Sequence, residues 1–418
     1  MAAMESARVR VAERRQLRLE AIDLDSLIGA EHPARAIWGV LERMDLSRFY
    51  APIKAVEGGP GQDATDPKIL IALWLYAISE GVASAREIDR LCTMHSAYRW
   101  IRGGVSLNYH LLSDFRSAHG AALDELFSQL LAVLMHQQLV SLKRVAQDGT
   151  RVRASAGAAS FRREPRLEQC LAQARLHIEA LQLAAEQPDP QRGAREQAAQ
   201  ERAARERAAR LEQALAELPK VAAQKKNRAA APRVSSTDPE ARVMKMGDGG
   251  FRPAYNLQFA ADTESRIIVG VAACNAGTDS KQLEPMLDQL ERRTQRLPAQ
   301  VLVDGGFTNL ASFARVAERG VEVFAPLRKH NQTYKLDPAA PHPADPPAIA
   351  AYRQRMASAE GQQVYKQRTA TIETVNADLK TYRGLDRLLV RGAAKVLSVA
   401  LWAALTYNLM RGITMGWL

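Results

Sequence analysis

The sequence VAQDGT, at residues 145–150, lies where the pattern of the chain changes from helical to strand-like. Side chains alternate over residues 142–153 with the period of a half-buried β-strand. A second stretch, AQVLVDGG at residues 299–306, is an apolar run that also leads into an aspartate followed by glycine. Because ligands of open α/β sheets bind at the carboxyl ends of strands, we expect Asp148 and Asp304 each to present a carboxylate at a strand end.

Strand and helix patterns continue to the end of the chain. Residues 255–261 and 267–273 alternate on either side of a short polar turn, which predicts a β-hairpin. Helical and strand patterns then follow one another. This order predicts an α/β fold in which a mixed sheet is flanked by helices. We assign the first strand of this domain to residues 141–160 and its remainder to residues 231–418.

The segment 161–230 interrupts the α/β pattern. It is rich in Ala, Glu, Arg, Gln and Leu and has almost no aromatic residues. Leu167, Leu171 and Ile178 follow a heptad-like spacing, and the sequence ERAAR occurs twice in residues 201–210. We expect a helical hairpin inserted into the α/β domain. Of two interpretations, a solvated spacer is favoured over an arm that grips DNA.

Residues 1–140 are predicted to be helical. Asp66-Pro67 provides an N-cap and a proline at the first helical position, and SARE at residues 84–87 is a capping box. Short helices joined by tight turns are typical of DNA-binding domains of the helix-turn-helix type. They are equally typical of a plain helical bundle, so both interpretations stay open.

The chain is basic, with 57 Lys and Arg against 46 Asp and Glu and a formal net charge of +11. This excess favours a polyanionic partner, nucleic acid ahead of an anionic membrane, over a basic protein without such a partner. Cys92, Cys170 and Cys274 are far apart, so we expect a reducing cytoplasm and neither a disulfide framework nor a zinc knuckle. The apolar stretch 396–410 is short for a membrane span, so we expect a core helix and no membrane partner.

A third carboxylate, Glu373, lies in a long segment of helical pattern. A helix turns by about 100° per residue, so Lys380 lies roughly 20° from the direction of Glu373. Arg387 and Arg391 share this face if the helix continues through Gly384. A carboxylate followed by a cationic row can hold a metal and follow a phosphate backbone. Taken alone, however, the helix favours a solvated basic face whose glutamate pairs with Lys or Arg.

The three carboxylates together predict a metal site. Asp148, Asp304 and Glu373 can form a cage for two hard cations, which cuts or joins phosphodiesters by in-line displacement. Other chemistries have less support, because no Ser or Cys lies in a nucleophile elbow and no GxxxxGK[ST] loop is present. Isolated Asp-Gly pairs are common turn signals, so the prediction depends on all three residues.

The same residues resemble the motifs of a known family. DGT at residues 148–150 and DGGF at residues 304–307 resemble the first two acidic motifs of bacterial insertion-sequence DDE transposases. YKQRTATIE at residues 365–373, followed by Lys380, resembles their third motif, in which Tyr and Arg precede the catalytic Glu and Lys follows it by seven residues. The interval from the Arg to the Glu is one residue longer here than in some branches of the family. Residues 67–116 are similar to the family's N-terminal DNA-binding domain.

The resemblance implies an RNase H-like core that holds two Mg²⁺ ions, for which Mn²⁺ can substitute. Asp148, Asp304 and Glu373 would be the catalytic residues and the metal ligands. Contacts with DNA are expected from the third motif and from the cationic row that follows it: Tyr365, Arg368, Lys380, Arg383, Arg387 and Arg391.

We therefore expect a DDE transposase that acts in the bacterial cytoplasm, at the nucleoid. It would bind terminal inverted repeats through residues 1–140, nick the element's ends and join them to target DNA, as a homodimer that pairs two ends. Neither ATP nor a covalent protein–DNA intermediate is expected. Two alternatives stay open, a stand-alone RNase H-like nuclease and an inactive DNA-binding remnant of a transposase.

Overall fold

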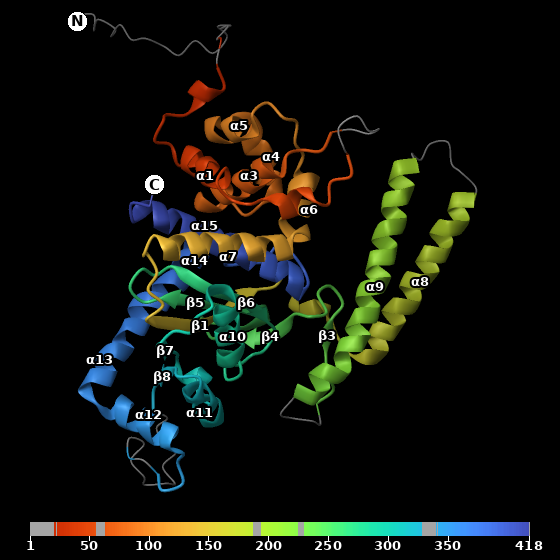
Figure 1. Ribbon diagram of the computed structural model, residues 1–418. Helices are drawn as coiled ribbons and strands as arrows, with labels where there is room; N and C mark the ends of the chain where they lie inside the picture. Colours follow the sequence, from red (N-terminus) through yellow and green to blue (C-terminus); the bar gives the residue numbers. More distant parts are fainter. Residues whose placement is uncertain are drawn as a thin grey trace, which may run out of the picture.

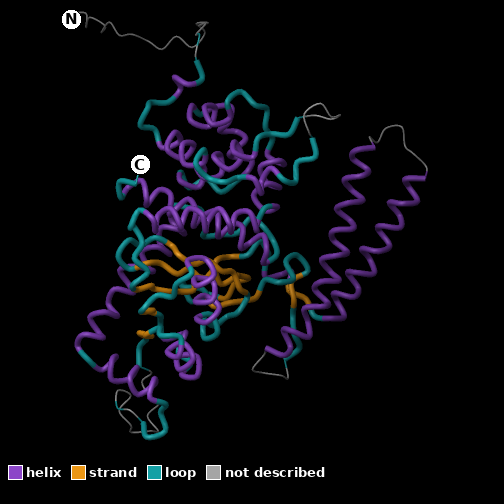
Figure 2. The backbone as a smooth tube through the Cα atoms, viewed as in Figure 1, coloured by secondary structure: helices purple, strands orange, loops and turns teal. Residues whose placement is uncertain are grey.

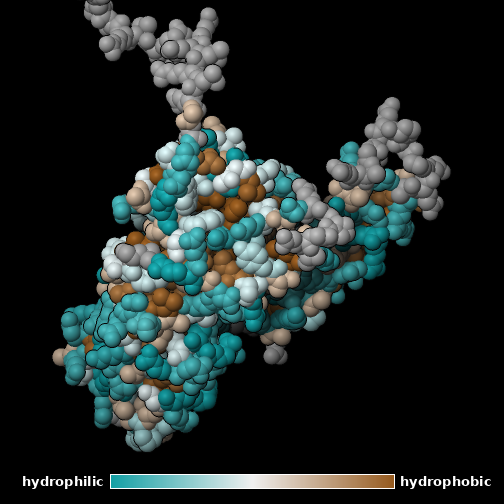
Figure 3. Space-filling model, turned by 45° about the horizontal axis from the view of Figure 1, so that its top comes forward, coloured by the Kyte–Doolittle hydropathy of each residue, from teal (hydrophilic) through white to brown (hydrophobic). Residues whose placement is uncertain are grey.

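The computed structural model describes residues 21, 23–55, 63–186, 194–224, 230–327, 340 and 342–417. The N-terminal helices form a layer on one side of the molecule, α7 (Gly120–His136) and α15 (Ala393–Thr414) lie beneath them, and the β-sheet follows (Figure 1). A pair of long helices projects from the side of the sheet (Figure 2). The surface of this pair and of the arm around α12 and α13 is largely hydrophilic in the view of Figure 3.

The N-terminal part is helical, as predicted. Asp66 caps α3 by accepting a hydrogen bond of 2.8 Å from the Lys68 amide, and Pro67 is the first residue of that helix. Ser84 precedes α4 at the N-cap position but makes no capping bond through its side chain, so the predicted capping box does not form. The longer helices are α1 (Pro33–Leu41), α3 (Pro67–Ser79), α4 (Ala85–Met94), α5 (Ser96–Arg102), α6 (Tyr109–Ala118) and α7 (Gly120–His136).

The C-terminal helix α15 (Ala393–Thr414) joins the N-terminal helices to the sheet. The indole of Trp402 donates to the Arg116 carbonyl at 3.0 Å, and the Asn408 side chain exchanges hydrogen bonds with the backbone of Ile268 on the sheet. The helix is long and apolar enough to cross a membrane, but 67% of its apolar window is buried inside the protein. This burial confirms the predicted core helix.

Six strands form one mixed sheet in the order β4–β5–β1–β7–β8, with β6 also paired to β5. β5 is antiparallel to β1, β4 and β6, whereas β7 runs parallel to both β1 and β8. Helices flank this sheet, so the predicted RNase H-like α/β fold is confirmed. The strands are β1 (Arg144–Arg153), β4 (Arg242–Lys245), β5 (Phe251–Asp262), β6 (Ile268–Cys274), β7 (Gln300–Leu302) and β8 (Glu322–Phe324); the helices after β6 and β7 are α10 (Leu283–Thr294) and α11 (Leu310–Glu318).

The inserted hairpin is also confirmed. It consists of α8 (Glu164–Glu186) and α9 (Ala194–Gln224) and is attached through the short pair β2 (Phe161–Arg162) and β3 (Val234–Ser235). Leu167 and Leu171 of α8 pack with Leu211 and Leu218 of α9 in a small core of their own. The heptad-like leucines therefore close the hairpin.

The single long helix expected around Glu373 is not present. The segment divides into α12 (Pro347–Ala357), α13 (Ala359–Arg368), the π-helical turn η4 (Thr369–Glu373) and α14 (Thr374–Thr381). Gly384 adopts a left-handed conformation with a φ of 67°, beyond the end of α14. Arg387 and Arg391 therefore do not continue a helical row from Glu373, because the helix ends before them.

Candidate active site

The pairing of β1 with β7 places the two aspartates side by side. Ala146 faces Leu302 in this parallel pair, so both Asp148 and Asp304 lie two residues beyond the last matched position. Asp304 follows the carboxyl end of β7 as predicted, and its carboxylate accepts from the Gly306 amide at 2.9 Å. Asp148 does not end its strand, since β1 continues to Arg153 alongside β5. The parallel half of the sheet stops at the aspartates while the antiparallel half extends past them.

Glu373 reaches the same place from the π-helical turn η4. Arg368 donates from Nη2 to Glu373 Oε1 at 2.7 Å and from Nη1 to Asp148 Oδ2 at 3.3 Å. One guanidinium thus bridges a carboxylate of the sheet and a carboxylate of the helical segment. The structure brings together Asp148, Asp304 and Glu373, which the sequence places far apart.

The electrostatics of Asp148 reflect this crowding. Burial raises the pKa of Asp148 to about 6, Arg368 opposes the shift, and the nearby charges of Asp304 and Asp279 add to it. Burial also tends to lower the pKa of Arg368, but Tyr365, Asp148 and Glu373 outweigh this effect and raise it. The site therefore carries more negative charge than its single buried arginine offsets, which favours cations.

Sequence reasoning missed Asp279, a fourth carboxylate at the site. Its Oδ1 accepts from Asn256 Nδ2 at 2.7 Å and from Gln258 Nε2 at 2.6 Å, and the residue is 9% exposed. Gly149 lies against this group, because a Cβ atom there would collide with Asp279 Oδ1 and Gln258 Nε2. Asn256 and Gln258 lie on one face of a strand that is otherwise mostly apolar. This i, i+2 pair of buried amides was the signal that a polar partner faces β5.

The donor chemistry of the site fits divalent metal ions. Mg²⁺ and Mn²⁺ prefer carboxylate oxygens, and Asp148, Asp304 and Glu373 supply them around a buried excess of negative charge. Within the described residues, however, no three carboxylate, imidazole or thiolate groups already converge closely enough to hold an ion. The Arg368 guanidinium, whose Nε has no hydrogen-bond partner, lies between Asp148 and Glu373 in the position of a countercharge.

The predicted DNA contacts divide into two groups. Tyr365 and Lys380 lie at the site: the Tyr365 hydroxyl interacts with the charge of Arg368, and Lys380 interacts with the charge of Asp148. Burial raises the pKa of Tyr365 and lowers that of Lys380.

The remaining arginines lie elsewhere. Arg383 donates to Asp378 Oδ1 at 2.9 Å and to the Ser79 carbonyl at 2.8 Å, which ties α14 to α3. The backbone of Arg387 forms an isolated parallel β-bridge with Arg153, the last residue of β1. Arg391 donates to the Ser155 carbonyl at 3.3 Å beside the hairpin.

Comparison with known families agrees with this geometry. The model of the transposase DDE domain matches residues 225–409, a range that contains Asp304, Glu373 and Lys380. Asp148 precedes the matched range, so its place in the site depends on the pairing of β1 with β7 and on the contact with Arg368. No curated protein and no solved structure matches the chain.

Proposed function

We propose that the chain, whose residues 225–409 match the model of the transposase DDE domain, is an insertion-sequence DDE transposase that binds the terminal inverted repeats of its element, cleaves the ends and transfers them to target DNA. One observation carries the proposal. Asp148 and Asp304 each lie two residues beyond the last matched pair of the parallel strands β1 and β7, and Arg368 ties Glu373 to Asp148. Carboxylates from three different elements thus lie around one guanidinium, and metal ions would draw them together into a phosphodiester-processing site.

We infer that Asp148, Asp304 and Glu373 hold two Mg²⁺ ions, with Mn²⁺ as a substitute. When bound, such ions activate the attacking water or 3′-hydroxyl and stabilise charge on the leaving oxygen. Arg368 keeps Asp148 and Glu373 adjacent and offsets part of their repulsion. Lys380 and Tyr365 lie beside the same carboxylates and would contact the phosphates that flank the scissile bond.

The N-terminal helices would recognise the DNA ends, and two copies of the chain would pair two ends as a homodimer. The expected setting is the bacterial cytoplasm, at the nucleoid. The positive net charge of +11 supports a polyanionic partner of this kind.

A single reaction tests the proposal against its alternatives. The protein is incubated with labelled duplexes that carry the element's ends, a target plasmid and Mg²⁺. Joined products support a transposase, nicks without joining support a stand-alone nuclease, and binding alone supports an inactive remnant.

The variant Asp304→Asn sharpens this assignment. It keeps the shape of the side chain but removes a charged oxygen ligand, so joining is expected to be lost while binding of the ends stays within about twofold. Glu318→Gln at the exposed end of α11 makes the same carboxylate-to-amide change away from the site and serves as a control that should join normally. Joining by Asp304→Asn at the wild-type rate would exclude Asp304 from the catalytic site.

A further inference from the structure

A cavity rich in arginine lies where the hairpin meets the sheet domain. It has a volume of 330 Å³ and receives Arg207 and Arg210 from α9, Arg162 from β2 and Arg391 from the loop before α15. The hydroxyl residues Ser236 and Thr237, which follow β3, complete its polar lining. No acidic residue lines it. We call this cavity the arginine pocket.

The pocket is assembled by separate, firmly held segments. Arg207 and Arg210 are three residues apart on α9, so both point from one face of a helix whose other face is packed on α8. Arg162 is fixed by the pairing of β2 with β3. Because Gly392 donates to the buried Asp238 carboxylate at 3.3 Å, the loop that carries Arg391 is anchored as well.

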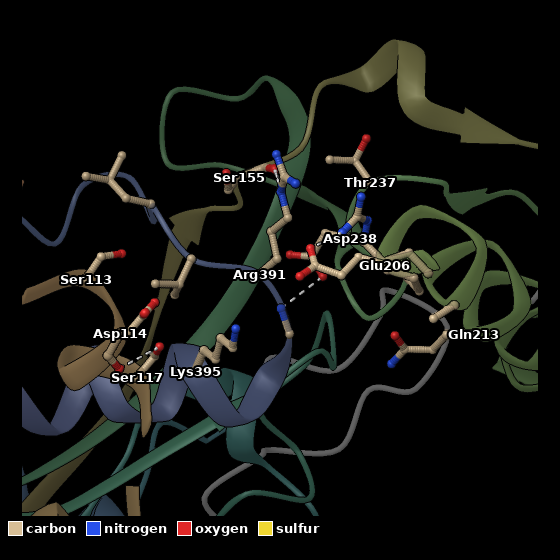
Figure 4. A pocket seen from close by; sticks show the side chains of 16 residues that line it. Ser113, Asp114, Ser117, Ser155, Glu206, Gln213, Thr237, Asp238, Arg391 and Lys395 are labelled. Carbon is tan, nitrogen blue, oxygen red and sulfur yellow. Dashed lines mark hydrogen bonds and ion pairs between the residues drawn. The ribbon is translucent and has the colours of Figure 1, made fainter. Parts of the chain in front are cut away.

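The positive charge of the pocket is largely uncompensated. Among the described residues, no carboxylate forms an ion pair with Arg162, Arg207 or Arg391, and the contact of Arg210 with Glu206 is long, at 3.6 Å. A second cavity of 570 Å³ adjoins the pocket and shares Arg210, Thr237 and Arg391 with it. Figure 4 shows Arg391 and Lys395 of this second cavity, whose lining also includes the acidic residues Asp114, Glu206 and Asp238. Four guanidinium groups around one hollow are the donors that suit phosphate oxygens.

The pocket also lies at a useful distance from the carboxylates. Arg391 contacts the carbonyl of Ser155, which lies seven residues beyond Asp148 and two residues after the end of β1. An extended chain advances about 3.3 Å per residue, so this contact lies up to about 23 Å from Asp148. One DNA strand advances about 3.4 Å per phosphate, so this separation corresponds to about seven nucleotides.

We propose that the arginine pocket binds a backbone phosphate of DNA about seven nucleotides from the scissile bond. The inference rests on the proposed function for the identity of the DNA, and it makes the hairpin a DNA-gripping arm rather than a spacer. Contacts with phosphates carry no sequence information, so the pocket would contribute affinity and register without sequence preference.

The test compares the double variant Arg207→Ala/Arg210→Ala with a matched control, Arg202→Ala/Arg205→Ala. Both remove two arginines from α9, but only the first pair lines the pocket. Single phosphates of an end duplex are replaced by neutral methylphosphonates, and the affinity of each duplex is measured by fluorescence anisotropy. Wild type and control should lose affinity when a phosphate about seven nucleotides from the cleavage position is neutralised. The pocket variant should bind that neutralised duplex as tightly as it binds the unmodified duplex.

Salt dependence gives an independent reading. Each lost phosphate contact reduces the slope of log K against log[salt] by about 0.9, so between 50 and 200 mM salt the pocket variant should lose about 3.5-fold less affinity than the control. The single variant Arg162→Ala on β2 should show the same pattern, which guards against misfolding of an altered α9.

The possible failures are distinguishable. If the pocket variant shows the same methylphosphonate profile and salt slope as the control, the pocket is not a phosphate site. If wild type binds ends with the expected profile but never joins them, the pocket stands and the proposed transposase activity fails.

Discussion

Gly149 tests whether the active site depends on the close approach of Asp279. The residue lies within β1 in an extended conformation, so glycine is required there for space rather than for backbone freedom. A methyl group in Gly149→Ala would collide with Asp279 Oδ1 and Gln258 Nε2 and would approach Asn256 Oδ1 to 2.7 Å. Asp279 Oδ1 accepts from Gln258 Nε2 and from Asn256 Nδ2, and Asn256 Oδ1 is buried beside them without a partner, so the carboxylate of Asp279 must leave its two amide donors.

The expected cost follows from those two hydrogen bonds. A hydrogen bond to a charged group contributes about 1.5 kcal/mol or more, and overpacking adds about 1–3 kcal/mol. With partial relaxation we expect a loss of about 3 kcal/mol in the free energy of unfolding, equivalent to a fall in Tm of about 3–4 °C for a chain of 418 residues. Differential scanning calorimetry measures this change.

Gly305→Ala is the matched control, because it adds the same methyl group beside Asp304 where no atom lies within 4 Å. It should change Tm by less than about 2 °C. In the background Asp279→Ala, the cost of Gly149→Ala should fall by about 2 kcal/mol, since the colliding oxygen is gone. A Gly149→Ala protein as stable as wild type, or a cost independent of residue 279, would refute this reasoning.

Three further outcomes are expected. Burial raises the pKa of Asp148 to about 6, above the value near 3.9 of an unfolded chain. The free energy of unfolding therefore decreases as the pH rises from about 4 to about 6. In urea unfolding, Asp148→Asn should therefore gain about 2 kcal/mol over wild type between pH 4 and pH 7, and a constant difference would contradict the raised pKa. Lys380→Ala should weaken end binding and reduce the salt slope by about 1, and an unchanged slope would remove Lys380 from the DNA contacts. Arg383→Ala, which breaks hydrogen bonds to Asp378 and Ser79, should lower Tm but leave that slope unchanged; a reduced slope would restore Arg383 to the DNA surface.

The strands that carry the site could be predicted from the sequence, whereas their pairing and register could not. The alternating and apolar runs indicated β1 and β7, but the pairing that makes Asp148 level with Asp304 is a tertiary choice of register. The same choice lets β1 pass the carboxylates to Arg153 because β5 pairs with it there, which local patterns do not reveal. Asp279 lies in a loop before α10 and has no periodic signal of its own.

The prediction that Arg387 and Arg391 share a helical face with Glu373 is wrong for a local reason. It required an unbroken helix from Glu373 to Arg391, and the left-handed Gly384 lies between them. The break sends Arg391 toward the hairpin, where it contacts Ser155 and lines the arginine pocket. Because the helix ends, a residue expected at the active site through helical geometry instead contacts the chain just beyond the end of β1, up to about 23 Å from Asp148.

The π-helical turn accounts for the long interval in the third acidic motif. In a regular α-helix, residues five apart differ by about 500°, so Arg368 and Glu373 would point about 140° away from each other. In a π-helical turn the backbone hydrogen bonds span five residues, so each turn holds more residues and the angle between side chains five apart is smaller. Here the two side chains meet, with Nη2 of Arg368 2.7 Å from Glu373 Oε1. The additional residue in the sequence and the π turn in the structure are therefore one feature. It allows Glu373 to face Asp148 through Arg368 while α14 continues in register to present Lys380 at the same site.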